Sequence, residues 1–137
     1  MKDCSFCKKI KGELPSIKLF ENKYVVAFAP LKKVIIGKGH MLLVPKKHFE
    51  SIYDIDEFYL CELFKAVKEI SIKLKDIGAD GINILHASGK SGQQSVSHFH
   101  LHLIPRFKDD GLDTWPKTGY KETNFLDCYK EFCFNQQ

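Results

Sequence analysis

The chain has 137 residues, of which 44% are hydrophobic and 28% are charged. This length predicts one domain over residues 1–137, and the ordinary composition excludes a disordered or fibrous protein. The formal net charge is only +4 and the lysines are scattered in runs of at most two, so an extended nucleic-acid surface is not expected.

The location of the protein is predicted from its apolar runs and its cysteines. No apolar run approaches the ~18 residues of a membrane-spanning helix, and the amino-terminal stretch lacks the apolar core of a secretory signal. The five cysteines are an odd number, which disfavours a disulfide framework. We therefore expect a cytoplasmic protein, with Cys61 as a buried thiol inside a helical pattern.

The first third of the chain is predicted to form a short helix and three strands. The helix covers Cys4–Lys11. Ile17–Glu21 and Tyr24–Ala29 are rich in β-branched and aromatic residues and are joined by two residues, which predicts a hairpin. After a loop over residues 31–39, His40–Pro45 forms the third strand.

The strongest helical pattern covers Asp54–Ile77, with Asp54 as its N-cap. Apolar residues recur at spacings of three and four, which indicates one buried helical face. They are Leu60, Leu63, Phe64, Val67, Ile70, Leu74 and Ile77. Two further strands are expected at Gly81–His86 and His98–Pro105, and a C-terminal helix from about Asn124 to Phe134.

This order of elements predicts the fold class. Strands, one long helix and then further strands favour an α+β fold. We expect an antiparallel sheet of about five strands with the long helix packed on one face, together with the C-terminal helix.

Three histidines alternate with apolar residues in one predicted strand, HFHLHLI. Because strand side chains alternate between faces, His98, His100 and His102 are expected to share one face while the apolar residues face the helix. Imidazole can act as a nucleophile, a general acid or base, or a metal ligand. Three histidines at this spacing point to function rather than packing, whereas His86 is interpreted as a strand-end histidine without a catalytic role.

The loop before this strand, residues 88–95, is small, polar and rich in glycine. Its Gly89-Lys90-Ser91 does not complete a Walker A phosphate loop, because Ile84 stands where that motif needs glycine. Alone, it would be an ordinary connection. Beside the histidine strand, it is better interpreted as a phosphate cradle.

Cys4 and Cys7 form a C-x-x-C pair at the amino terminus. Two thiolates at this spacing can bind one metal ion. A redox pair and two unrelated thiols remain open as alternatives.

These motifs together resemble one family. The segment His98–Ile104 resembles the H-φ-H-φ-H-φ-φ motif that names the histidine triad (HIT) family of nucleotide hydrolases and transferases. The likeness extends over nearly the whole chain, through Cys4–Cys7, Gly39–His48 and Gly92–Arg106. It is greatest to the branch that acts on purine nucleoside phosphoramidates, and it implies a HIT-like fold.

The resemblance also implies an active site. His100 matches the nucleophile that attacks the α-phosphorus to form a nucleotidyl-histidine. His102 matches a contact to the phosphate and leaving group, and His40 matches a supporting histidine. Ser95 and Gln94 match phosphate and leaving-group contacts, and the loop glycines Gly89 and Gly92 are assigned to substrate binding with them.

A structural zinc site and a homodimer are implied in the same way. Cys4, Cys7, His48 and His98 match four zinc ligands, which leaves His100 and His102 for catalysis. In relatives of this kind, the segment after the histidine strand reaches the partner subunit's active site. Trp115 is therefore assigned to substrate binding within a homodimer.

Two positions depart from the family pattern. Relatives usually carry an acidic residue after the second strand, which holds the ribose hydroxyls, but Pro30 stands here. A common asparagine is replaced by Ala87. Selectivity for ribose or purine is therefore expected to be loosened or achieved differently, while the chemistry is expected to survive.

Three functions compete at this point. The first is an enzyme that cleaves a nucleoside phosphoramidate or a mixed nucleotide anhydride and releases a nucleoside monophosphate. The second is a nucleotide-sensing or protein-interaction module with little turnover. The third is a dinucleoside polyphosphate hydrolase. All three imply a small-molecule nucleotide as the ligand.

Overall fold

A computed structural model describes residues 3–115 together with Tyr129, Phe132 and Phe134. Within these residues, a five-stranded antiparallel sheet has the order β1-β2-β3-β5-β4. Its elements, in chain order, are α1 (Ser5–Ile10), β1 (Lys18–Glu21), β2 (Val25–Phe28), the 3-10 helix η1 (Lys32–Val34), β3 (Met41–Pro45), α2 (Glu57–Asp76), β4 (Gly81–Leu85) and β5 (Leu101–Arg106). The predicted α+β fold with one long helix is confirmed.

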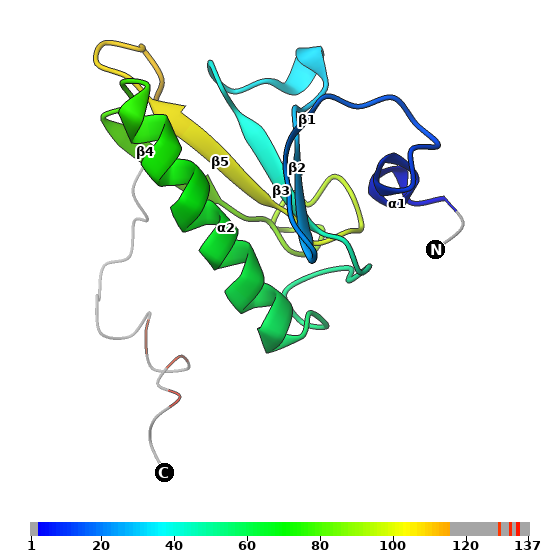
Figure 1. Cartoon of the computed structure of the whole chain (residues 1–137). Coiled ribbons are helices and arrows are strands. Elements are labelled where there is room, and N and C mark those ends of the chain that lie inside the picture. Colours follow the sequence, from blue (N-terminus) through cyan, green and yellow to red (C-terminus); the bar gives the residue numbers. More distant parts are fainter. Residues whose placement is uncertain (1–2, 116–128, 130–131, 133, 135–137) are drawn as a thin grey trace.

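The sheet is covered on both faces (Figure 1). On one face, α2 packs against the main core, in which Leu63 of the helix meets Leu43 and Leu103 of the sheet. On the other face, Phe6 of α1 packs with alternate residues of β2 and β3, such as Phe28. The central strands are therefore apolar on both sides, and α1 encloses a second, smaller core.

The α2 helix begins three residues later than the pattern predicts. The carboxylate of Asp54 accepts hydrogen bonds from the backbone N–H groups of Glu50 and Ser51, at 2.9 and 2.7 Å, so it caps the preceding turn instead. Asp56 occupies the N-cap position. An aspartate carboxylate can cap either a helix or a turn, and here Asp54 caps the turn that precedes α2.

The buried stripe of α2 is narrower than predicted. Leu63, Val67, Ile70 and Leu74 are buried, but Phe64 and Ile77 are 51% and 72% exposed. Cys61 is exposed as well, so its prediction as a buried thiol is wrong. A single sheet face covers only about one third of a helix, and these side chains point to its flank or lie beyond its end.

The strand that carries the histidines begins three residues later than predicted. β5 begins at Leu101, so His98 and His100 precede it rather than belonging to it. The alternation of faces nevertheless holds through this extended segment, because Phe99 joins the α2 core with Leu101 and Leu103. The backbone N–H of Phe99 donates to the carbonyl of Phe49 at 2.7 Å, which fixes the approach to the strand.

The predicted C-terminal helix at about Asn124 to Phe134 lies outside the described residues, apart from three isolated positions. Among the described residues, no helix has the length and apolar character needed to cross a membrane.

Candidate functional site

A cavity of about 660 Å³ opens on the α1 face of the sheet. This volume is within the range of small-molecule sites, about 300–1,000 Å³. His40, His100, His102 and Ser95 all line it, so the structure brings together the four residues predicted to carry the chemistry. Its remaining walls come from α1, from β3, from residues 14–15 and from the segment 30–34 that includes η1.

His100, the predicted nucleophile, is held in one tautomer. Its Nδ1 lies 2.8 Å from the carbonyl oxygen of His98, and because a carbonyl only accepts, Nδ1 must carry the proton. Nε2 then keeps its lone pair. The ring is buried, and Phe6 contacts it edge-on with ring centroids 5.2 Å apart.

His102 is fixed in the opposite tautomer through His40. The backbone N–H of Ile36 donates to His40 Nδ1 at 3.1 Å, so the proton of His40 is on Nε2. That Nε2–H donates to Nδ1 of His102 at 2.9 Å. His102 therefore carries its own proton on Nε2. The pair in the cavity consists of one imidazole with a free lone pair and one with a free N–H.

These imidazoles are neutral at pH 7. Burial, together with a smaller effect of the positive charge that neighbouring histidines can carry, lowers the pKa of His102 to about 4. Burial also lowers the pKa of His100 and of His40. A neutral imidazole is the form that can act as a nucleophile.

Gln94, Gly89 and Gly92 do not line this cavity. The side chain of Gln94 turns into its own loop, where its oxygen accepts from the N–H of Gly89 at 2.8 Å and its NH₂ group donates to the carbonyls of Glu50 and Val96. At Gly92, an added Cβ would lie 2.5 Å from the carbonyl oxygen of Ser88, so the tight loop needs glycine. These residues shape the loop that presents Ser95.

Trp115 is 75% exposed and lies outside the cavity. Its assignment depends on a partner subunit and stays a prediction.

His86 supports the histidine segment in a way that the sequence did not indicate. Its ring stacks on Phe99 at a centroid distance of 4.3 Å, and its Nδ1–H donates to the carbonyl of His100 at 2.8 Å. Its Nε2 accepts from the hydroxyl of Ser88 at 2.6 Å, and that oxygen accepts from the N–H of Ile52. Without a motif around His86, no pattern could have identified this role.

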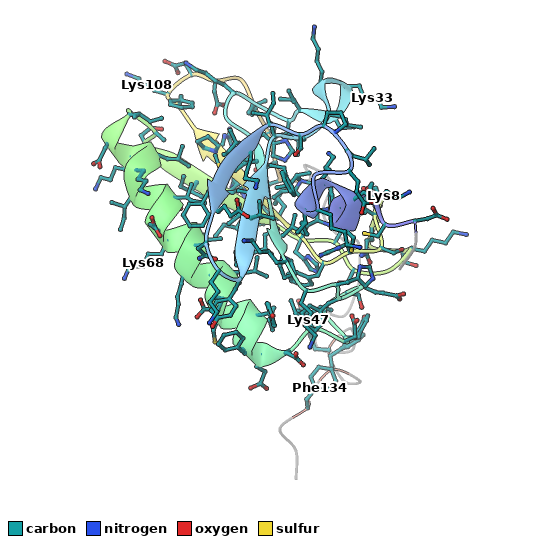
Figure 2. The ribbon with its side chains drawn as sticks, turned by 45° about the vertical axis from the view of Figure 1, so that its right-hand side comes forward. Lys8, Lys33, Lys47, Lys68, Lys108 and Phe134 are labelled. Atoms are coloured by element: carbon teal, nitrogen blue, oxygen red, sulfur yellow. The ribbon has the colours of Figure 1, made fainter. Side chains whose placement is uncertain are left out.

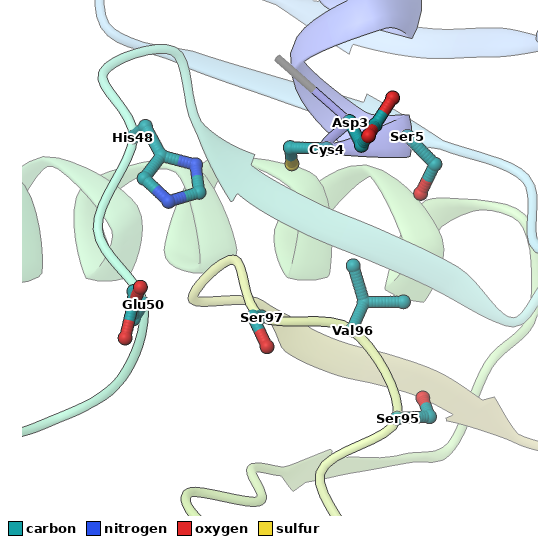
Figure 3. A pocket seen from close by; sticks show the side chains of 8 residues that line it. All are labelled: Asp3, Cys4, Ser5, His48, Glu50, Ser95, Val96 and Ser97. Carbon is teal, nitrogen blue, oxygen red and sulfur yellow. The ribbon is translucent and has the colours of Figure 1, made fainter. Parts of the chain in front are cut away.

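A second cluster lies beside the cavity, where α1, the loop after β3 and the segment before β5 meet. Cys4, Cys7, His48 and His98 each place one ligand atom there, all within 4.8 Å of one another. Figure 3 shows Cys4 at the start of α1 facing the loop that carries His48, with the Ser95–Ser97 segment passing beside both.

Three sulfur–nitrogen and nitrogen–nitrogen distances in this cluster are close to those of one tetrahedral ion. With the usual Zn–S and Zn–N bond lengths, a tetrahedral site places sulfur and nitrogen about 3.5 Å apart and two nitrogens about 3.3 Å apart. Here Sγ of Cys4 lies 3.3 Å from Nδ1 of His98, Sγ of Cys7 lies 3.4 Å from Nδ1 of His48, and the two Nδ1 atoms are 3.2 Å apart.

The groups around the cluster also suit a cation. Nε2–H of His98 donates to the carbonyl of Pro45 at 2.9 Å, which leaves Nδ1 free as a ligand. Burial raises the pKa of the Cys7 thiol, and Cys4 raises it further. Two thiolates at this place therefore require a positive charge between them.

The model of the HIT domain family matches residues 11–109, which include the histidine segment and most of the residues that line the cavity. The chain belongs to the HIT domain family. A Saccharomyces cerevisiae protein named adenosine 5′-monophosphoramidase HNT1 is 39% identical over 124 residues, covering 89% of this chain and 73% of that protein.

Solved structures of HIT proteins are similar throughout. A histidine triad nucleotide-binding protein from Candida albicans has a TM-score of 0.78 and 33% identity, covering 94% of this chain and 92% of that one. A zinc-bound histidine triad family protein from Mycobacterium smegmatis has a TM-score of 0.74 and 27% identity, covering 86% of this chain and 85% of that one.

This HIT domain departs from the expected ribose contact in its cavity wall. Pro30 is buried and lines the cavity next to Leu31. Among the described residues, no aspartate or glutamate lines the cavity. Ala87 does not line it either. At both positions the polar side chain expected from the family is absent, and among the described residues no carboxylate in the cavity takes its place.

Proposed function

We propose that this HIT domain is a nucleotidyl hydrolase or transferase that cleaves at the α-phosphate of a nucleoside phosphoramidate or a mixed nucleotide anhydride. The opposed tautomers of His100 and His102 carry this proposal. Attack at phosphorus requires a nitrogen with a free lone pair, and departure of the leaving group is helped by an N–H donor. His100 and His102 supply these two groups in one cavity. The relatives named adenosine 5′-monophosphoramidase support the substrate class.

The reaction follows from these two nitrogen atoms. Nε2 of His100 forms a bond to the α-phosphorus as the bond from phosphorus to the leaving nitrogen or oxygen breaks. The Nε2–H of His102 donates a hydrogen bond to the leaving group, which departs as an amine when the substrate nitrogen is already protonated, or as an anion such as sulfate. Water then forms a bond to the phosphorus as the bond to Nε2 of His100 breaks, which releases the nucleoside monophosphate and one proton to solvent. Ser95 lies where its hydroxyl can donate to a phosphate oxygen.

The cluster of Cys4, Cys7, His48 and His98 is proposed as a structural zinc site. Its four protein ligands leave no open position for substrate, which is typical of zinc that stabilises a fold. The zinc-bound relative from Mycobacterium smegmatis supports this assignment. When bound, the ion would supply folding free energy rather than chemistry.

A homodimer of single-domain subunits is also proposed. β4 is an edge strand of the sheet, and Ile84 on it is 41% exposed. Phe64 and Ile72 of α2 are 51% and 55% exposed. An unpaired strand edge and exposed apolar residues each favour association with another copy. Light scattering should then give twice the 15.8 kDa of one chain.

Turnover of adenosine 5′-phosphoramidate tests the enzymatic function. The wild-type protein is expected to release AMP, and His100→Ala should lose about 10³-fold or more, because the nucleophile is removed. Unchanged melting temperature and zinc content in the variant would show that it is folded. Comparable turnover by His100→Ala would exclude this nucleophile, and no turnover by the wild type would favour a sensor or a dinucleoside polyphosphate hydrolase.

A further inference from the structure

The cavity beside the histidines has an unusual charge pattern along its wall. Lys9 and Lys33 line it, while among the described residues no carboxylate does. The sequence around this wall is similarly biased, because residues 22–49 contain six lysines and no aspartate or glutamate. Any ligand in the cavity therefore meets positive charge from these two lysines and no negative charge.

Lys9 is placed at the wall by two aromatic rings. Its Nζ lies 5.8 Å from the ring centroid of Phe6 and 5.9 Å from that of Phe28. Phe6 in turn contacts His100, so one aromatic ring separates the ammonium group from the predicted nucleophile. Lys9 is half-buried and forms no ion pair with any described residue.

Lys33 approaches the same cavity from η1. Figure 2 labels it on the 3-10 helix, and it also forms no ion pair with a described residue. By contrast, Lys46 and Lys47 of the same acid-free stretch are paired with Glu21 and Asp56. Lys23, Lys32 and Lys38 also form no ion pair with a described residue, but they do not line this cavity. Lys9 and Lys33 are therefore the unpaired charges that a ligand in the cavity meets.

Apart from these lysines, the wall away from the histidines is mostly apolar. Leu14, Pro15, Pro30, Leu31 and Val34 contribute to it, and proline offers no backbone N–H. Such a wall suits the faces of a base and a sugar but offers no carboxylate to accept from a free ribose diol. In dinucleotide-binding folds, an acidic residue selects the free 2′-hydroxyl, whereas a basic residue accommodates a phosphate at that position.

We propose that the cavity selects nucleotides that carry an additional phosphate on the ribose, at the 2′ or 3′ position, with Lys9 and Lys33 binding that phosphate. The proposal rests on the proposed function for the place of the scissile 5′-phosphoryl group at His100. The reaction is unchanged, so a 3′-phosphorylated substrate would release a nucleoside 3′,5′-bisphosphate and its leaving group.

Binding of three adenine nucleotides tests this selection independently of turnover. Adenosine 3′,5′-bisphosphate and adenosine 5′-diphosphate are isomers with the same number of phosphates, and AMP lacks the second phosphate. By calorimetry, we expect the 3′,5′- or the 2′,5′-bisphosphate to bind about tenfold or more tightly than both AMP and the 5′-diphosphate, because charge-assisted contacts are among the stronger hydrogen bonds. Equal or weaker binding of both bisphosphates would overturn the proposal.

Variants identify the binding groups. Lys9→Gln and Lys33→Gln should each reduce the preference for the bisphosphate over AMP, whereas Lys32→Gln should keep it. Lys32 is the neighbour of Lys33 on η1 but does not line the cavity. A preference that survives both Lys9→Gln and Lys33→Gln would overturn the assignment. Because Lys33 is exposed, its variant is a test even where Lys9→Gln fails to fold.

Turnover separates this inference from the proposed function. The matched substrates are adenosine 5′-phosphosulfate and its 3′-phosphorylated form, both mixed anhydrides with sulfate as leaving group. A higher kcat/KM for the phosphorylated form supports both proposals. Equal turnover of the two substrates contradicts only the selection. Tight bisphosphate binding without turnover of either substrate supports the selection and contradicts the enzymatic function.

Discussion

Nε2 of His40 lies 2.9 Å from Nδ1 of His102, and the two rings are stacked with centroids 5.2 Å apart. Because the backbone N–H of Ile36 occupies the other nitrogen of His40, this contact has only one direction, from His40 to His102. His40 thereby determines which nitrogen of His102 carries the proton that faces the cavity.

Removal of His40 should therefore impair hydrogen-bond donation to the leaving group without abolishing the nucleophile. We expect His40→Ala to lower kcat about 10²-fold, as when one donor aimed at developing charge is removed. His40→Gln keeps an N–H donor at the end of its side chain and should recover part of the loss. Steady-state kinetics of both variants measure this, and equal rates for the two would refute the role of His40 as a donor.

The lowered pKa of His102 predicts a pH dependence of stability. The value falls to about 4 in the folded protein because of burial, whereas an unfolded histidine titrates near 6.5. Between these values the unfolded chain binds more protons than the native one, so stability rises with pH. The contribution is complete above about pH 6.5 and is lost as the pH falls toward about 4.

Melting temperatures across this window measure the effect. The wild type should lose stability from about pH 6.5 downward, and His102→Gln, which cannot titrate there, should show a shallower decline. An identical slope for the two proteins would contradict the assignment. The rate of the proposed phosphoramidase reaction, which needs neutral imidazoles, should persist to lower pH than an ordinary histidine would allow.

The metal cluster predicts about one zinc per chain in the purified protein. Cys7→Ser should lose this zinc and melt at a lower temperature, since metal binding contributes to folding. Cys61→Ser is the matched control, because that thiol is exposed on α2 and far from the cluster in the sequence. Elemental analysis that finds equal zinc in both variants would disprove the assignment.

The main core predicts a large effect at Leu63. This side chain is fully buried between α2 and the sheet, so Leu63→Ala should lower the free energy of unfolding by about 2–5 kcal/mol. Its neighbour Phe64 is 51% exposed, and Phe64→Ala should cost much less. Denaturant unfolding of both variants measures the difference, and a reversed order would mean that the buried face of α2 is misassigned.

Part of this structure could be predicted because it depends on periodicity. The alternation of His98, His100 and His102 with apolar residues fixes opposite faces whatever the exact start of the strand, and the structure keeps it although β5 begins at Leu101. The spacing of Leu63, Val67, Ile70 and Leu74 likewise determines the buried face of α2.

Other features depend on contacts between distant segments, which periodicity does not contain. The tautomer of His40 depends on a backbone N–H four residues earlier, in an irregular loop. His86 acts through a backbone carbonyl fourteen residues away. The side chain of Gln94 had several polar partners within reach, and only the folded loop decides among them.

The sequence also could not predict which individual apolar residues are exposed. Phe64 fits the helical period as well as Leu63 does, but a sheet face covers only one stripe of a helix, and Phe64 lies outside that stripe. The lysine pattern of the cavity appeared only when α1 and η1 were brought to the same wall, because Lys9 and Lys33 are distant in the sequence.

His98 serves two neighbours at once: its ring belongs to the metal cluster, and its carbonyl holds the proton of His100. Any change that loosens the ring also frees the carbonyl. In a genetic screen for loss of turnover, substitutions at Cys4, Cys7 and His48 would therefore be recovered beside those at His100. An investigator mapping such alleles would draw the proposed active site too large, with the proposed metal ligands inside its boundary.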